Sequence, residues 1–83
     1  LGQSLSIFPN PSDGNFNLSF TLESSENVEL RVLNSAGQII LKNNLGSIDK
    51  YDGSIDLSNQ AKGMYILQIE TSNGTVNRRV TIQ

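Results

Sequence analysis

The sequence offers few residues that could do acid–base or metal chemistry, and the closest group of them is Asp49, Asp52 and Asp56. Paired carboxylates can hydrolyse glycosides, and carboxylate oxygens can also hold Ca²⁺. The spacing of these aspartates matches no EF-hand loop, however, and a chain of 83 residues has little room for a cleft. We therefore interpret the three carboxylates as solvated groups of a polar loop, and we expect no metal site and no cofactor.

Histidine and cysteine are both absent from the chain. Without histidine, neither a Ser–His nor a Cys–His nucleophile can form, and the usual general base near neutral pH is missing. Without cysteine, disulfides and thiolate metal sites are excluded. The composition therefore predicts a protein that is not an enzyme and has no catalytic residues.

The charged residues are scattered along the chain, with eight acidic and six basic side chains and a net charge of -2. A polyanion such as nucleic acid has no basic patch to bind here, so we expect no nucleic-acid partner. No apolar run approaches the ~20 residues of a membrane helix, so we also expect no membrane insertion. The first residues lack the basic and apolar regions of a signal peptide, and any export signal is expected outside this chain.

The two tyrosines could in principle stack against a sugar, as aromatic platforms do in carbohydrate-binding β-sandwiches. Tyr65 alternates with core residues, however, and we assign it to the core. This assignment leaves Tyr51 as a single exposed ring, which makes no row of aromatic side chains.

The elements that would position these side chains are short strands. In four stretches apolar and polar residues alternate with a period of two, which places one set on a single face of a sheet. Three shorter stretches are flanked by turn residues, and no segment shows helical spacing. The predicted strands span residues 5–8, 15–22, 28–32, 38–42, 54–57, 65–69 and 76–83.

Turn signals that contain glycine separate these strands, at residues 10–14, 35–37, 52–53, 62–63 and 73–74. The pair Asn73-Gly74 is the strongest, because both residues tolerate the positive φ of a type I′ turn. Arg78 interrupts the alternation of the last strand. Either a bulge resets the phase there, or its guanidinium leaves the edge of the core for solvent.

Seven short strands with frequent turns predict an all-β fold, and specifically a seven-stranded antiparallel β-sandwich of immunoglobulin-like kind. The apolar side chains on the inward faces would form its core. The predicted core consists of Phe16, Leu18, Phe20, Leu30, Val32, Ile55, Leu57, Tyr65, Leu67, Val80 and Ile82.

Four segments, called the motif segments below, carry a resemblance to a known family in their order and spacing. Residues 7–16 (Ile-Phe-Pro-Asn-Pro-Ser-Asp-Gly-Asn-Phe) and residues 30–37 (Leu-Arg-Val-Leu-Asn-Ser-Ala-Gly) are the first two. The third joins Ile-Asp-Leu-Ser at residues 55–58 to Gly-Met-Tyr-Ile-Leu-Gln-Ile at residues 63–69, and the fourth is residues 78–83 (Arg-Arg-Val-Thr-Ile-Gln). Together they resemble the C-terminal sorting domains of the type IX secretion system.

The resemblance implies a sorting domain at residues 5–83, preceded at residues 1–4 by the remainder of a linker from an upstream cargo. Such a domain directs the fused N-terminal cargo from the periplasm of a Gram-negative bacterium to the cell surface or the medium. Its implied partners are the outer-membrane translocon, shuttle proteins and a sortase-like surface protease that removes the domain. The sequence does not determine whether the domain forms homo-oligomers.

The final strand is the expected recognition surface, because no loop follows it and its polar face could be presented to a receptor groove. That face carries Asn77, Arg79, Thr81 and Gln83. Arg78 and Arg79 would also protect an edge strand against aggregation. The Pro-Asn-Pro segment is expected to shape a turn and to act indirectly. The residues assigned to the recognition motif are Pro9, Asn10, Pro11, Gly14, Gly37, Gly63, Tyr65, Arg78, Arg79, Val80, Ile82 and Gln83.

Two other functions remain open at the level of the sequence. A carbohydrate-binding or adhesive β-sandwich module would require an exposed aromatic row or a Ca²⁺ site. An immunoglobulin-like spacer of a modular secreted enzyme would tolerate further residues after Gln83, whereas a sorting signal would not.

Overall fold

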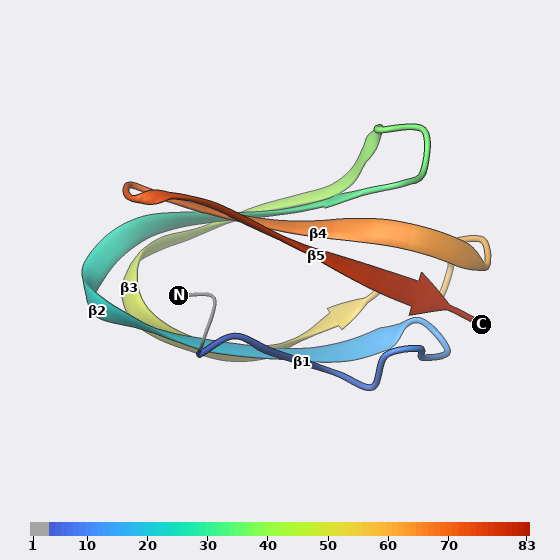
Figure 1. The fold of residues 1–83 in the computed structure, drawn as a ribbon, viewed down its shortest axis with the longest axis horizontal. Helices are drawn as coiled ribbons and strands as arrows, with labels where there is room; N and C mark the ends of the chain where they lie inside the picture. Colours follow the sequence, from blue (N-terminus) through green and yellow to red (C-terminus); the bar gives the residue numbers. More distant parts are fainter. Residues whose placement is uncertain (1–3) are drawn as a thin grey trace.

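The computed structural model describes residues 4–83, and all regular structure in this range is β-strand (Figure 1). The described range contains no helix of the length and apolarity that crossing a membrane requires. The all-β prediction is therefore confirmed. The five strands are β1 (Ser6–Phe8), β2 (Asn15–Leu33), β3 (Ile39–Asp56), β4 (Gly63–Thr71) and β5 (Gly74–Ile82).

The prediction of seven strands was wrong, because two pairs of predicted strands are each one continuous strand. β2 continues through the polar residues 23–27, and its register against β3 shifts between Thr21 and Glu26. A shift of this kind lets a strand bend without losing its partner. The polar residues break the apolar alternation but not the pairing, which is why the pattern alone indicated separate strands.

All strand pairs are antiparallel, and they form one sheet in which β2 is central. The sheet order is β1-β2-β4-β5, with β3 paired along the length of β2. Because β2 and β3 both curve strongly, the first half and the second half of each strand lie in opposite layers (Figure 1). A single curled sheet therefore replaces the immunoglobulin-like sandwich that the sequence favoured.

The core lies between the two layers and contains every residue that the alternation assigned to it. All eleven predicted core residues are buried, and Leu22, Val28 and Ile69 join them. The period of two therefore identified the inward faces correctly, even where it misplaced the ends of the strands.

The segment around Gly53 is a strand and not the turn that Asp52-Gly53 indicated. Gly53 lies opposite Leu18 in the β2–β3 ladder, and a Cβ added to it would lie 2.5 Å from the hydroxyl oxygen of Tyr51. The glycine is needed because the Tyr51 ring lies over its backbone. That ring is half-buried and stacks on Phe20 with centroids 5.7 Å apart, so the expectation of an exposed tyrosine was also wrong.

The hairpin between β4 and β5 is confirmed, but its turn differs from the type I′ prediction. Thr71 pairs with Gly74, so the two loop residues are Ser72 and Asn73. In residues 4–83 only glycines have positive φ, and here it is Gly74 that adopts it. Arg78 pairs with Leu67 in an unshifted register, so no bulge resets the phase of β5.

Candidate recognition surface

The loop that follows β1 is hydrogen-bonded to the end of β5, 69 to 71 residues away in sequence. The side-chain amide of Asn10 donates to the carbonyl of Arg79 at 2.9 Å. Its carbonyl oxygen accepts from the backbone N–H of Thr81 at 3.1 Å. One asparagine side chain thus makes the two hydrogen bonds that a neighbouring strand would offer.

The backbone of Ser12 continues this pairing. The Ser12 N–H donates to the carbonyl of Thr81 at 3.0 Å, and the N–H of Gln83 donates to the carbonyl of Ser12 at 2.8 Å. Ser12 also forms a parallel bridge with Ile82 and is buried. Asn10 and Ser12 therefore cover the outer backbone edge of the last part of β5, an arrangement called the loop–strand contact below.

The loop–strand contact joins the first and fourth motif segments, which carried part of the recognition motif. It leaves the side chains of Arg79 and Gln83 exposed and Thr81 half-buried. The backbone edge beside them is paired, so an approaching receptor meets these side chains and not a free strand edge.

Sequence reasoning missed Ser12, although its position between Pro11 and an Asp-Gly pair was a signal of a local side-chain hydrogen bond.

Gly14 anchors the same loop against the segment after β3. Its φ of +118° is in the region that favours glycine, and an added Cβ would lie 2.7 Å from the Cα of Ser58. The Gly14 N–H donates to the Ser12 hydroxyl oxygen at 2.9 Å, and the Gly14 carbonyl accepts from the N–H of Leu57 at 2.7 Å. Pro9 and Pro11 are exposed, and both are preceded by cis peptide bonds.

The three aspartates between residues 49 and 56 are not brought together by the fold. Asp49, Asp52 and Asp56 all lie on β3, and no group of three acidic, histidine or cysteine side chains in residues 4–83 could hold a metal ion. The Asp56 carboxylate accepts from the hydroxyl and the N–H of Ser58, at 2.6 and 2.9 Å. These two hydrogen bonds lower the pKa of Asp56, and its role is to order the chain after β3.

Three further residues assigned to the recognition motif are buried in the folded domain, and two others are exposed glycines at a turn and at the start of a strand. Tyr65, Val80 and Ile82 are buried in the core, and the Tyr65 hydroxyl donates to the carbonyl of Ala61. Gly37 has a φ of +85° in the turn between β2 and β3, and Gly63 begins β4. These residues shape the fold.

The two adjacent arginines of β5 have different surroundings. Arg78 lies on the core side, is half-buried, and donates to the carbonyl of its neighbour Asn77. Its guanidinium thus leaves the core for the strand edge, as one of the two sequence alternatives proposed. Arg79 lies opposite Ile66 and its side chain is exposed on the outer face.

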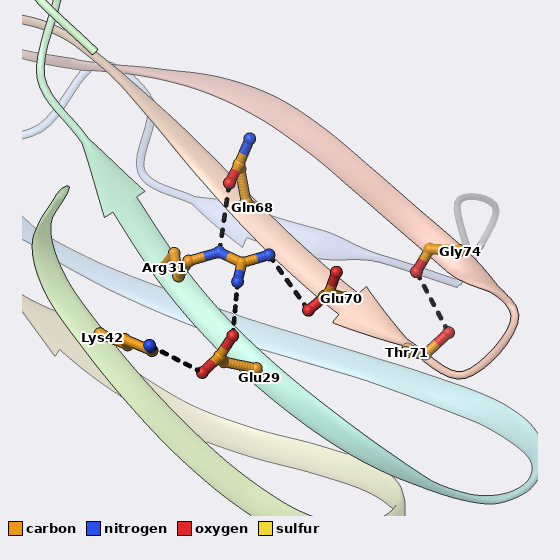
Figure 2. A network of polar contacts seen from close by, with 7 residues as sticks. All are labelled: Glu29, Arg31, Lys42, Gln68, Glu70, Thr71 and Gly74. Atoms are coloured by element: carbon orange, nitrogen blue, oxygen red, sulfur yellow. Dashed lines mark hydrogen bonds and ion pairs between the residues drawn. The ribbon is translucent and has the colours of Figure 1, made fainter. Parts of the chain in front are cut away.

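A network of polar side chains ties three strands together on that outer face (Figure 2). The guanidinium of Arg31 on β2 contacts Glu29, donates to Gln68 of β4 at 3.3 Å, and pairs with Glu70 of β4 at 3.3 Å. Lys42 of β3 pairs with Glu29 at 3.6 Å. The Arg31 side chain is only 17% exposed, so its contacts are less screened than those of a free surface pair.

Replacing Arg31 with leucine should lower the free energy of unfolding by about 1–2 kcal/mol, because Glu29 and Glu70 would then face each other with only one cation nearby. Lys42→Ala is the matched control. Its side chain is 61% exposed, so it should cost less than about 0.5 kcal/mol. Urea unfolding measures both, and equal losses would contradict a special role for Arg31.

Glu26 joins the bend of β2 to the β4–β5 hairpin. Its carboxylate accepts from the Ser72 hydroxyl at 2.8 Å, and this hydrogen bond is the main cause that lowers the pKa of Glu26 below its ordinary value of 4.5. Thr71 and Asn73 contribute in the same direction.

A lowered carboxyl pKa makes the folded state more stable above the ordinary pKa, and this stability is lost as the pH falls through the lowered value. As the pH falls below 4.5, the melting temperature of the domain should therefore decrease more steeply than that of Glu26→Gln. Thermal melts followed by circular dichroism at a series of pH values test this. If the melting temperature depends on pH in the same way for the domain and for Glu26→Gln, Glu26 does not contribute to the stability of the folded state.

Comparison with known proteins places these features in a family. The model of the secretion system C-terminal sorting domain matches residues 6–83, which include all four motif segments. The chain is also 35% identical over 81 residues to beta-agarase D of Zobellia galactanivorans, an alignment that covers 96% of this chain and 15% of the agarase. The chain thus spans less than a sixth of the length of this relative. The match confirms the resemblance to type IX sorting domains, and the chain belongs to the family of secretion system C-terminal sorting domains.

Proposed function

We propose that this domain directs an upstream cargo protein across the outer membrane through the type IX secretion system and is then removed by a sortase-like protease. Membership of the sorting-domain family supports the proposal. The observation that carries it is the loop–strand contact. Through Asn10 and Ser12 the first and last motif segments form one continuous surface, which an unfolded chain end would not have.

The proposal requires no reactive group on the domain. A receptor that recognises a shape needs exposed side chains on a rigid scaffold, and the curled sheet supplies both. The domain acts as a substrate and a signal, and the translocon, the shuttle proteins and the protease act on it. The fused cargo then reaches the cell surface or the medium of a Gram-negative bacterium.

The recognition motif divides into two groups under this proposal. Arg79, Gln83 and the loop residue Asn10 contact the secretion machinery or position the groups that do. Gly14, Tyr65, Val80 and Ile82 keep the recognised surface folded, because they are buried.

The predicted linker at residues 1–4 lies mostly outside the described residues, which begin at Ser4. The Ser4 hydroxyl donates to the carbonyl of Thr21 at 2.8 Å and accepts from the N–H of Thr21 at 3.3 Å. On the basis of these contacts we propose that Ser4 is part of the folded domain and that the protease cleaves before it.

The carbohydrate-binding alternative has no support among the described residues. Tyr65 is buried, and Tyr51 is half-buried with its ring stacked on Phe20, so the two rings do not form an exposed aromatic platform. Export of a fused foreign protein also separates a sorting signal from a spacer of a modular enzyme, because a spacer would not export it.

Fusion of residues 1–83 behind a periplasmic reporter tests the proposed function. In a host with a type IX system the reporter should appear at the surface or in the medium, and in the same host without the translocon it should stay in the periplasm. Retention of the reporter in both hosts, with the domain folded, would refute the proposal.

A further inference from the structure

A largely apolar groove lies on the outer face of β4. It has a volume of about 330 Å³. Leu33 of β2 and Met64 and Ile66 of β4 line it, and the turn between β2 and β3 forms one side. Gln68 of β4 and Arg79 of β5 are the other lining residues. A groove of this size accommodates one or two side chains of a peptide.

The outer face departs from the usual pattern of a solvated sheet at this place. Ile39, Leu33 and Ile66 lie opposite one another across β3, β2 and β4, and all three are on the outer face. Ile39 is 54% exposed and Met64 46%. A row of apolar side chains on a face that meets water favours a binding surface.

The side of the groove is ordered without any partner. The Asn34 side-chain oxygen accepts from the N–H groups of Ala36 and Gln38, both at 3.0 Å. The backbone of Asn34 makes two further hydrogen bonds, with Gly37 and Gln38. Figure 1 shows this turn standing away from the sheet on the side of β4. Binding would therefore cost little ordering of the turn.

The charge of Arg79 in the groove lining indicates the chemistry of the occupant. Arg31 and Lys42, on the same face, are both paired with glutamates. The Arg79 guanidinium has no such partner in residues 4–83, although its backbone carbonyl is bound by Asn10. Among the side chains of a peptide, a carboxylate is the group that an arginine binds most strongly.

We propose that this groove binds an extended peptide segment of a partner protein in the secretion machinery, with an aliphatic or aromatic side chain between Leu33, Met64 and Ile66 and an adjacent carboxylate on Arg79. The inference rests on the proposed function and names the surface through which it acts. The second, third and fourth motif segments meet at this groove, although they are far apart in the sequence.

The first test is a titration of the ¹⁵N-labelled domain with a capped Leu-Phe-Asp-Leu peptide, followed by NMR. Chemical shifts should change at Leu33, Met64, Ile66 and Arg79, and Arg79→Gln should weaken binding about tenfold. Lys50→Gln, which removes an exposed cation from β3, is the control and should bind as the unaltered domain does. A capped Leu-Phe-Asn-Leu peptide, which lacks the carboxylate, should bind the unaltered domain about tenfold more weakly than the aspartate peptide does. The Arg79→Gln domain should bind the two peptides with equal affinity. Shifts located elsewhere, or equal binding of the two peptides by the unaltered domain, would overturn the proposal.

The second test uses the reporter fusion with Arg79→Gln, Met64→Glu and the Lys50→Gln control. The first two should lose most of their export while their melting temperatures stay within a few degrees of the unaltered domain, and the control should keep its export. If the unaltered fusion is exported and both groove variants are exported equally well, the groove proposal fails and the sorting function stands. If the unaltered fusion is not exported, the sorting function fails, and the peptide titration still decides whether the groove binds.

Discussion

Gly14→Ala should lower the free energy of unfolding by about 3 kcal/mol, the largest effect we expect from a single methyl group in this domain. The added Cβ would lie 2.7 Å from the Cα of Ser58 and 2.9 Å from its nitrogen. Both atoms belong to the backbone, so neither can move away cheaply. The φ of +118° adds the cost of holding alanine in a conformation that favours glycine. Urea unfolding followed by circular dichroism measures the difference.

Gly37→Ala is the matched control for this prediction. Gly37 also has a positive φ, at +85°, but an added Cβ there would have no atom within 4 Å. We therefore expect it to cost only about 1 kcal/mol, which is the conformational part alone. Equal losses for the two variants would show that the close approach of Gly14 to Ser58 has no energetic role.

Removal of residues 78–83 should abolish both the cooperative unfolding transition and the export of a fused reporter. The deletion takes Val80 and Ile82 out of the core, where they are 1% and 3% exposed, and removes the part of the β4–β5 ladder that pairs residues 78–82 with residues 63–67. Each of these side chains contributes about 1.5–3 kcal/mol by burial. An 83-residue domain has a free energy of unfolding on the order of 4–12 kcal/mol, so the remaining chain should not fold.

The structure changes how this deletion is interpreted. Loss of export in the truncated chain would follow from unfolding alone, so it would not identify the final strand as the surface that a receptor contacts. Point changes on the exposed side of β5, such as Arg79→Gln, separate the two roles because the core stays intact. Unchanged export of the truncated fusion would contradict any requirement for the final strand, in folding or in recognition.

The alternation of apolar residues was sufficient to predict the all-β class and the core. Phe16, Leu18 and Phe20 are inward-facing because every second residue of a strand points to the same side, and this relation depends only on local sequence. The continuity of β2 was not predictable in the same way. Residues 23–27 are polar and give no periodic signal, and they remain in the strand only because β3 pairs beside the bend.

The contacts that define the candidate surface depend on tertiary structure. Nothing local to Asn10 indicates that its amide would meet Thr81, because the two are 71 residues apart and are brought together by the curl of the whole sheet. Gly53 shows a related limit. Asp-Gly is a common turn signal, but here the glycine makes room for the ring of Tyr51, and only the packing reveals that reason.

The family motifs predicted more of the candidate surface than the periodicity did. They singled out Asn10, Gly14 and Arg79 as significant, and the structure places all three at or beside the loop–strand contact. They could not distinguish exposed residues from buried ones. Tyr65 and Ile82 were assigned to recognition together with Arg79, and burial now separates them from it.

Whether the secretion machinery recognises the folded domain is tested most directly by the export of the Gly14→Ala fusion at two temperatures. Below the melting temperature of the variant, the exported fraction of the reporter should equal that of the unaltered fusion. Above it, but still below the melting temperature of the unaltered domain, export of the variant should cease while that of the unaltered fusion continues. Equal export of the unfolded variant at the higher temperature would contradict the account.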